Sequence, residues 1–81
     1  MAYLVEISPT AKKGLDGLPA EPQVRITGKI QSLGADPRPS WAAKGKCEGW
    51  CFAHEAYRAL YEVDDAARRV LVVEVGKGKC G

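Results

Sequence analysis

The chain has 81 residues and a mass of 8.7 kDa, and 46% of its residues are apolar. This number of apolar residues can form the core of one small domain but not the cores of two. Charged residues make up 27% without repeats, which excludes a disordered tail, a collagen-like repeat and a coiled coil. No apolar stretch approaches the length of a membrane-spanning helix, and the first residues lack the pattern of a signal peptide. We therefore expect a cytoplasmic protein that does not contact membranes.

The net charge of +2 is spread evenly, with five basic and four acidic residues in positions 1–41 and seven and six in positions 42–81. Bulk charge therefore favours no class of partner. Local placement is more informative, because Lys44 and Lys46 share one acid-free stretch, and Lys77 and Lys79 share another. The sequence thus predicts two small basic patches.

The N-terminal part predicts a strand followed by a helix. Residues 3–7 are rich in strand formers, and Ser8 and Pro9 are typical of a helix N-cap and of the first helical position. From Thr10 to Leu18, the apolar residues recur at helical spacing, and Gly17 and Pro19 indicate the end of the helix.

A second helix is expected from about Glu21 to Leu33. Its apolar stripe consists of Val24, Ile26, Ile30 and Leu33, and Gly34 follows as a stop signal. The two helices would form a hairpin. The proline-rich residues 36–40 are then expected to form a loop.

Three strands are expected in the C-terminal half, at residues 50–54, 57–63 and 69–75, with a turn at residues 64–67. The predicted order is β-α-α-β-β-β. We expect an α+β fold in which an antiparallel meander, joined by the first strand, carries the helix hairpin on one face.

The motifs along the chain resemble those of the RelE/ParE superfamily of toxins. The resemblance covers nearly the whole chain and is carried by these elements in order: an aromatic-rich first strand, Ser8-Pro9-x-Ala11-x-x-x-Leu15, Leu18-Pro19, Asp36-Pro37-Arg38-Pro39, Tyr57-Arg58-x-x-Tyr61-x-x-Asp64-Asp65, and Val75-Gly76-Lys77. It implies a RelE-like fold and a compact toxin of a type II toxin-antitoxin module. The expected partner is a cognate antitoxin that wraps the toxin in a hetero-oligomer.

The resemblance implies two alternative activities. The RelE branch cuts mRNA in the ribosomal A site, whereas the ParE branch inhibits DNA gyrase without being an enzyme. The RelE branch is favoured here, because both expected helices are shorter than the long hairpin associated with ParE. The expected activity is thus a ribosome-dependent mRNA endonuclease in which the ribose 2′-hydroxyl attacks the scissile phosphate, with the ribosome and mRNA as partners and with no metal or other cofactor. A third alternative is a catalytically dead relative that still binds an antitoxin.

RelE-like proteins use basic side chains clustered on the sheet, so the resemblance also implies site residues. Arg58 matches the arginine that contacts the phosphate. Lys77 and Lys79 would neutralise charge, and His54 is a candidate proton carrier because imidazole titrates near neutrality.

Other residues are expected to bind macromolecular partners. Lys44 and Lys46 would contact ribosomal RNA backbone. Trp50, Tyr57 and Tyr61 would contact the antitoxin, although Tyr57 and Tyr61 also share a face with core positions.

The sequence departs from the family pattern at two places. Cys51 and Ala53 stand where basic residues are expected, and the tail carries Lys77 and Lys79 in place of an arginine pair and has no following tyrosine. Lysines lack the bidentate geometry with which arginine binds phosphate. We therefore expect any nuclease activity to be attenuated.

The three cysteines leave alternatives open. Cys47, Cys51, His54 and Cys80 offer four zinc ligands, but Cys51 and His54 are three residues apart on an expected strand and would point to opposite faces. The spacing matches no common zinc module, so the sequence favours no metal site. A disulfide between Cys51 and Cys80, or between Cys47 and Cys51, is an alternative to reduced thiols.

Overall fold

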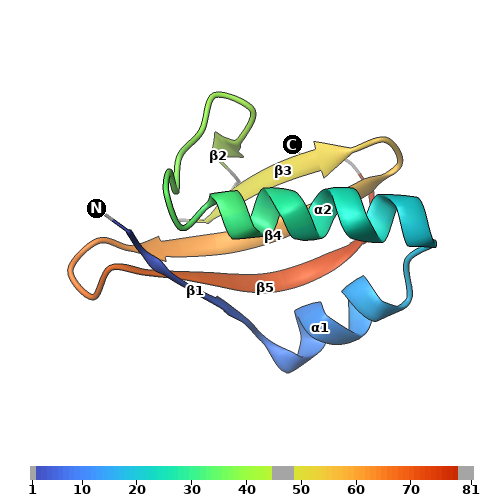
Figure 1. Cartoon of the computed structure of the whole chain (residues 1–81), viewed down its shortest axis with the longest axis horizontal. Coiled ribbons are helices and arrows are strands. Elements are labelled where there is room, and N and C mark those ends of the chain that lie inside the picture. Colours follow the sequence, from blue (N-terminus) through green and yellow to red (C-terminus); the bar gives the residue numbers. More distant parts are fainter. Residues whose placement is uncertain (1, 45–48, 79–81) are drawn as a thin grey trace.

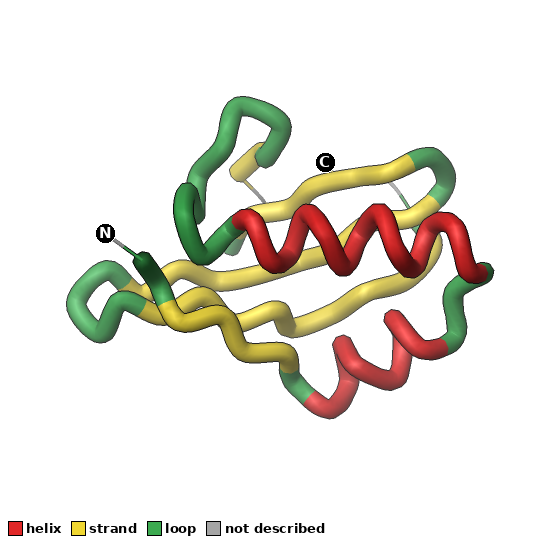
Figure 2. Tube along the Cα trace, in the orientation of Figure 1, coloured by secondary structure: helices red, strands yellow, loops and turns green. Residues whose placement is uncertain are grey.

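The computed structural model describes residues 2–44 and 49–78 and contains two helices and five strands in these ranges. In chain order (Figures 1 and 2) the elements are β1 (Leu4–Ile7), α1 (Pro9–Asp16), α2 (Ala20–Ser32), β2 (Ala43–Lys44), β3 (Trp50–His54), β4 (Tyr57–Asp64) and β5 (Arg69–Lys77). The α+β class and the order of the predicted elements are confirmed. No described helix is long and apolar enough to cross a bilayer.

The five strands form one sheet in the order β1-β5-β4-β3-β2. β3, β4 and β5 form the predicted antiparallel meander. The sheet as a whole is mixed, because β1 pairs with β5 in parallel, and the two-residue strand β2, which the sequence did not reveal, is added at the β3 edge.

The helix α1 begins as its sequence predicts. The Ser8 hydroxyl accepts a hydrogen bond from the Ala11 amide at 3.1 Å, and Pro9 occupies the first turn. The helix then packs so closely on β5 that a Cβ at Gly14 would overlap the Val75 carbonyl oxygen. Glycine is therefore required at Gly14 for the close approach of α1 to the sheet.

The helix α2 covers the same face of the sheet through Pro22, Ile26 and Ile30, with Leu33 just beyond its end. Val24, which the expected stripe included, is 68% exposed instead. The buried positions are thus spaced four, four and three residues apart, and Val24 falls outside this arc.

The two faces of the sheet differ in what covers them. On the covered face, under the helices, side chains from all the longer strands enter one core, which includes Phe52, Ala59, Tyr61, Val70, Val72 and Val75. On the opposite, open face, neither described helix packs. The positions on it include Glu6, Ala53, Arg58, Glu62, Leu71 and Glu74, and also Cys51, which is buried there.

The proline-rich loop is tied to the sheet by an ion pair at the surface. Both terminal nitrogens of Arg38 contact the Asp65 carboxylate, at 3.1 and 2.6 Å, and the Tyr3 hydroxyl donates to the same carboxylate at 2.6 Å. These hydrogen bonds from Arg38 and Tyr3 lower the pKa of Asp65. The contact joins the N-terminus, the loop and the β4–β5 turn.

Candidate functional site

The register of the meander places Arg58 on the open face of the sheet, between two small residues. Its direct neighbours are Ala53 on β3 and Gly76 on β5. One has only a methyl group and the other has no side chain, and a Cβ built at Gly76 would meet nothing within 4 Å. On the two neighbouring strands, the residues directly beside Arg58 are therefore both small.

Arg58 is held in place by an acidic neighbour. Its Nη2 donates to Oε1 of Glu74 at 2.7 Å, and the side chains are 23% and 47% exposed. Its Nη1 is buried and has no hydrogen-bond partner in the described part of the chain. One nitrogen of the fork is thus bound to a carboxylate, while the other retains an unused donor of the kind that binds phosphate.

The segment after β5 lies directly against Arg58. The Gly78 amide donates to the Ala56 carbonyl at 3.0 Å, and a Cβ at Gly78 would lie 2.7 Å from Nε of Arg58. Gly78 also has a φ of 140°, a conformation that other residues rarely adopt. Glycine is therefore favoured here both by this φ and by the lack of space for a Cβ beside Arg58. The backbone therefore confines the arginine from the C-terminal side.

The basic residues expected to assist Arg58 are only partly described. Lys77 is exposed and pairs with Tyr57, so its side chain alternates to the face opposite Arg58 at the very end of β5. Lys44, on β2, is also exposed. Lys46 and Lys79 lie outside the described residues.

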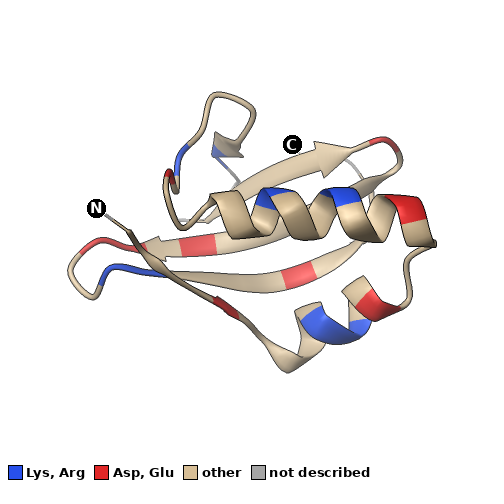
Figure 3. Cartoon of the chain, in the orientation of Figure 1, with Lys and Arg blue, Asp and Glu red and all other residues tan. Residues whose placement is uncertain are grey.

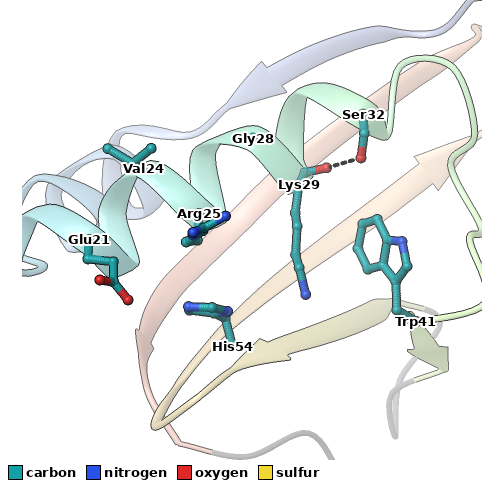
Figure 4. Close-up of a pocket in the computed structure, with 8 residues that line it drawn as sticks. All are labelled: Glu21, Val24, Arg25, Gly28, Lys29, Ser32, Trp41 and His54. Atoms are coloured by element: carbon teal, nitrogen blue, oxygen red, sulfur yellow. Dashed lines mark hydrogen bonds between the residues drawn. The ribbon is translucent and has the colours of Figure 1, made fainter.

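The structure separates His54 from Arg58. His54 pairs with Tyr57, whereas Arg58 pairs with Ala53, so the two side chains leave opposite faces of the sheet. Figure 4 shows the imidazole pointing up toward α2, into a cleft of about 600 Å³ that Trp41, Lys29 and Arg25 also line. The structure therefore does not bring His54 and Arg58 together, and a role for His54 as a proton carrier stays a prediction.

The three aromatic residues expected to meet an antitoxin occupy different positions. Trp50 and Tyr57 are half-buried at the edge of the core, and the Arg38 guanidinium lies 5.8 Å from the centre of the Trp50 ring. Tyr61 is completely buried, and its hydroxyl donates to the Pro37 carbonyl at 2.9 Å. Burial raises the pKa of Tyr61 to about 12. Tyr61 is therefore a core residue and is not accessible to a partner.

The cysteines do not form a zinc site with His54 in the described part of the chain. Cys51 is 2% exposed and is disulfide-bonded. It also pairs with Leu60 and therefore lies on the face opposite His54, as its spacing predicts. The other two cysteines, Cys47 and Cys80, lie outside the described residues.

Sequence reasoning missed the acidic partner of Arg58. Glu74 interrupts the apolar run of β5, and a lone carboxylate in such a strand is the signal that points to it. Its pairing with Leu60, two residues along from Arg58, places it on the same face. That placement depends on the register of two strands, which the sequence pattern does not specify by itself.

Three solved structures are similar over almost the whole chain. The toxin-antitoxin complex RelBE2 from Mycobacterium tuberculosis has a TM-score of 0.82 and 21% identity, and the match covers 96% of this chain and 100% of that chain. The isolated E. coli RelE toxin has a TM-score of 0.81 and 23% identity, with 99% of this chain and 88% of that chain covered. The archaeal RelE-RelB complex from Pyrococcus horikoshii OT3 has a TM-score of 0.80 and 20% identity, with 95% and 96% covered in the same order. No family model and no curated protein matches the sequence. The chain therefore has a RelE-like toxin fold.

Proposed function

We propose that this chain is the toxin of a type II toxin-antitoxin module and acts as a ribosome-dependent mRNA endonuclease. The observation that carries the proposal is the arrangement around Arg58 on the open face of a RelE-like sheet. Three features favour a phosphodiester as ligand: an arginine with an unused donor, a carboxylate 2.7 Å away, and small residues beside the arginine on both neighbouring strands.

In the proposed mechanism, Arg58 binds the scissile phosphate and stabilises the charge that develops on it. The ribose 2′-hydroxyl attacks the adjacent phosphorus, and the bond to the 5′-oxygen of the next nucleotide breaks. The leaving 5′-oxygen takes a proton from solvent water, so that the products are a 2′,3′-cyclic phosphate and a 5′-hydroxyl. Glu74 is the described carboxylate nearest to Arg58 and accepts the proton of the 2′-hydroxyl. Lys77, at the end of β5, adds positive charge, as does Lys79, which lies outside the described residues. Lys44 and Lys46 contact the ribosomal RNA backbone.

The test is primer extension on a defined mRNA in ribosomes with an empty A site. Arg58→Ala should lower cleavage by about 100-fold or more, the usual effect of removing a group that stabilises transition-state charge. The matched control is Arg69→Ala, because Arg69 is also on the open face and also lies near a carboxylate, with its Nε 3.4 Å from Glu6. The control should cleave like the unchanged chain.

Glu74→Gln separates binding from chemistry. The amide keeps the size of the side chain but is a much weaker proton acceptor, so we expect cleavage to fall by about 100-fold. RNA binding should strengthen, because Arg58 loses its intramolecular carboxylate. An uncut message with the folded chain, or equal cleavage by the Arg58 and Arg69 variants, contradicts the proposal and directs the next assay to DNA gyrase.

We also propose that an antitoxin covers the half-exposed aromatic residues Trp50 and Tyr57 and the groove between the two helices. Ile7 and Val24 line that groove and are 36% and 68% exposed. Apolar area of this kind favours an amphipathic segment of a partner. Co-purification with the product of the adjacent reading frame tests this, and Val24→Asp should weaken the complex while leaving the fold intact.

A further inference from the structure

The cleft beneath α2 holds a group of side chains that the proposed nuclease does not use. Glu21 from the first turn of α2, His54 from the end of β3 and Glu55 from the β3–β4 turn bring their ligand atoms within 4.8 Å of one another. In Figure 4 the Glu21 carboxylate points down toward the His54 ring. Figure 3 shows acidic segments at the start of α2 and in the turn after β3, at the same end of the molecule.

The imidazole of His54 has an unused nitrogen in this cleft. Its Nε2 is buried and has no hydrogen-bond partner among the residues described. Within residues 2–44 and 49–78, the nearest carboxylate oxygen is Oε1 of Glu55 at 4.0 Å, which is too far for a hydrogen bond. A buried polar atom without a partner costs free energy, and an imidazole nitrogen in this position is available as a ligand for a metal ion.

The three side chains form a ligand set for a transition metal. Imidazole nitrogen and carboxylate oxygen are both ligand types that zinc takes, and three protein ligands leave the fourth tetrahedral position for a water. Ligand atoms around tetrahedral zinc are about 3.4 Å apart, given bond lengths of about 2.1 Å. The present spacing must therefore shrink slightly, and both glutamates are exposed and can rotate inward.

We propose that Glu21, His54 and Glu55 bind one divalent transition-metal ion, zinc in particular, that links the start of α2 to the β3–β4 turn. The site differs in its residues from any cysteine-based zinc site, because neither Glu21 nor Glu55 is part of the cysteine pattern. It lies on the face of the sheet opposite Arg58 and does not depend on nuclease activity. Arg25 lines the same cleft, and its charge weakens the binding of a cation.

The experiment is a titration of the full chain with zinc alone, followed by calorimetry, and a parallel titration with cobalt, followed by absorption. We expect one ion per chain and an increase in Tm, because an ion that binds only the folded state stabilises it. His54→Gln should weaken zinc binding by about 100-fold and Glu21→Gln by about tenfold. The matched control is Glu62→Gln, which removes an exposed carboxylate from the open face and should bind zinc like the unchanged chain.

A further variant changes affinity in the opposite direction. Arg25→Ala removes a positive charge from the cleft and should tighten zinc binding severalfold, which a variant that merely damaged the fold would not do. Circular dichroism of each variant without metal checks that the fold is intact. The proposal is overturned if His54→Gln binds zinc as tightly as the unchanged chain, or if the cobalt complex shows the intense sulfur-to-metal absorption of thiolate ligands.

Discussion

The two faces of the sheet are made by the same strands and yet differ in almost every property. On β4, Ala59 and Tyr61 are completely buried under the helices, while Arg58 between the flanking strands is partly open to solvent and ion-paired. On β5, Val72 is completely buried and its neighbour Leu71 is 37% exposed. One residue along a strand therefore separates a position that stabilises the fold from a position available for a ligand, because successive side chains alternate.

The largest effect expected on the covered face comes from Gly14→Ala. The added methyl group would overlap the Val75 carbonyl, so α1 must move away from β5. Overpacking of this kind costs up to about 3 kcal/mol. Urea denaturation measures the loss, and unchanged stability would show that α1 does not need its close approach.

Tyr61 makes the covered face sensitive to high pH. Burial raises its pKa from 10.0 to about 12 in the folded chain, so the folded state retains the proton that the unfolded state releases. The stabilisation is complete below pH 10 and is lost between pH 10 and 12, by roughly 2 to 3 kcal/mol. Stability measured across this range should fall less steeply for Tyr61→Phe, which cannot ionise there.

Adjacent residues of β5 offer the most direct test of the two faces. Val72→Ala removes completely buried methyl groups and should lower the free energy of unfolding by about 2 kcal/mol, whereas Leu71→Ala should change it by less than about 0.5 kcal/mol. Thermal denaturation of the two variants side by side gives the difference. Equal losses would mean that the open face is covered in solution.

The smallest effect is expected at Gly28, on α2. A Cβ there meets nothing within 4 Å, so Gly28→Ala should raise stability by about 0.5 to 1 kcal/mol through helix propensity alone. It is also the counterpart of Gly14→Ala, since both add one methyl group inside a helix. A loss of stability at Gly28 would place that side of α2 in contact with the rest of the chain.

Much of the fold follows from local patterns. Ser8 and Pro9 begin α1 as their residue types predict, and the alternation of β4 and β5 identifies the covered face. Local patterns did not predict that β1 pairs in parallel with β5 or that the two residues of β2 form a strand. Both depend on contacts between distant segments, and β2 is too short to show a period.

The candidate site was accessible to the sequence only in part. Arg58 is recognisable from its motif, but Glu74 becomes its partner through strand register. His54 and Arg58 lie on opposite faces, and this too depends on how β3 and β4 pair. The cleft beneath α2 could not be predicted from the sequence either, because Glu21 comes close to His54 only through the packing of α2 on the sheet.

The position of β5 between β1 and β4 has a consequence for synthesis. Leu4 on β1 pairs with Arg69 on β5, so β1 cannot join the sheet before β5 has been synthesised. Parallel pairings between such distant segments form slowly. A nascent chain has a gap in the middle of its sheet until Lys77 has left the ribosome. For a toxin that acts on ribosomes, this order of folding would delay activity until β5 has emerged from the ribosome that makes it.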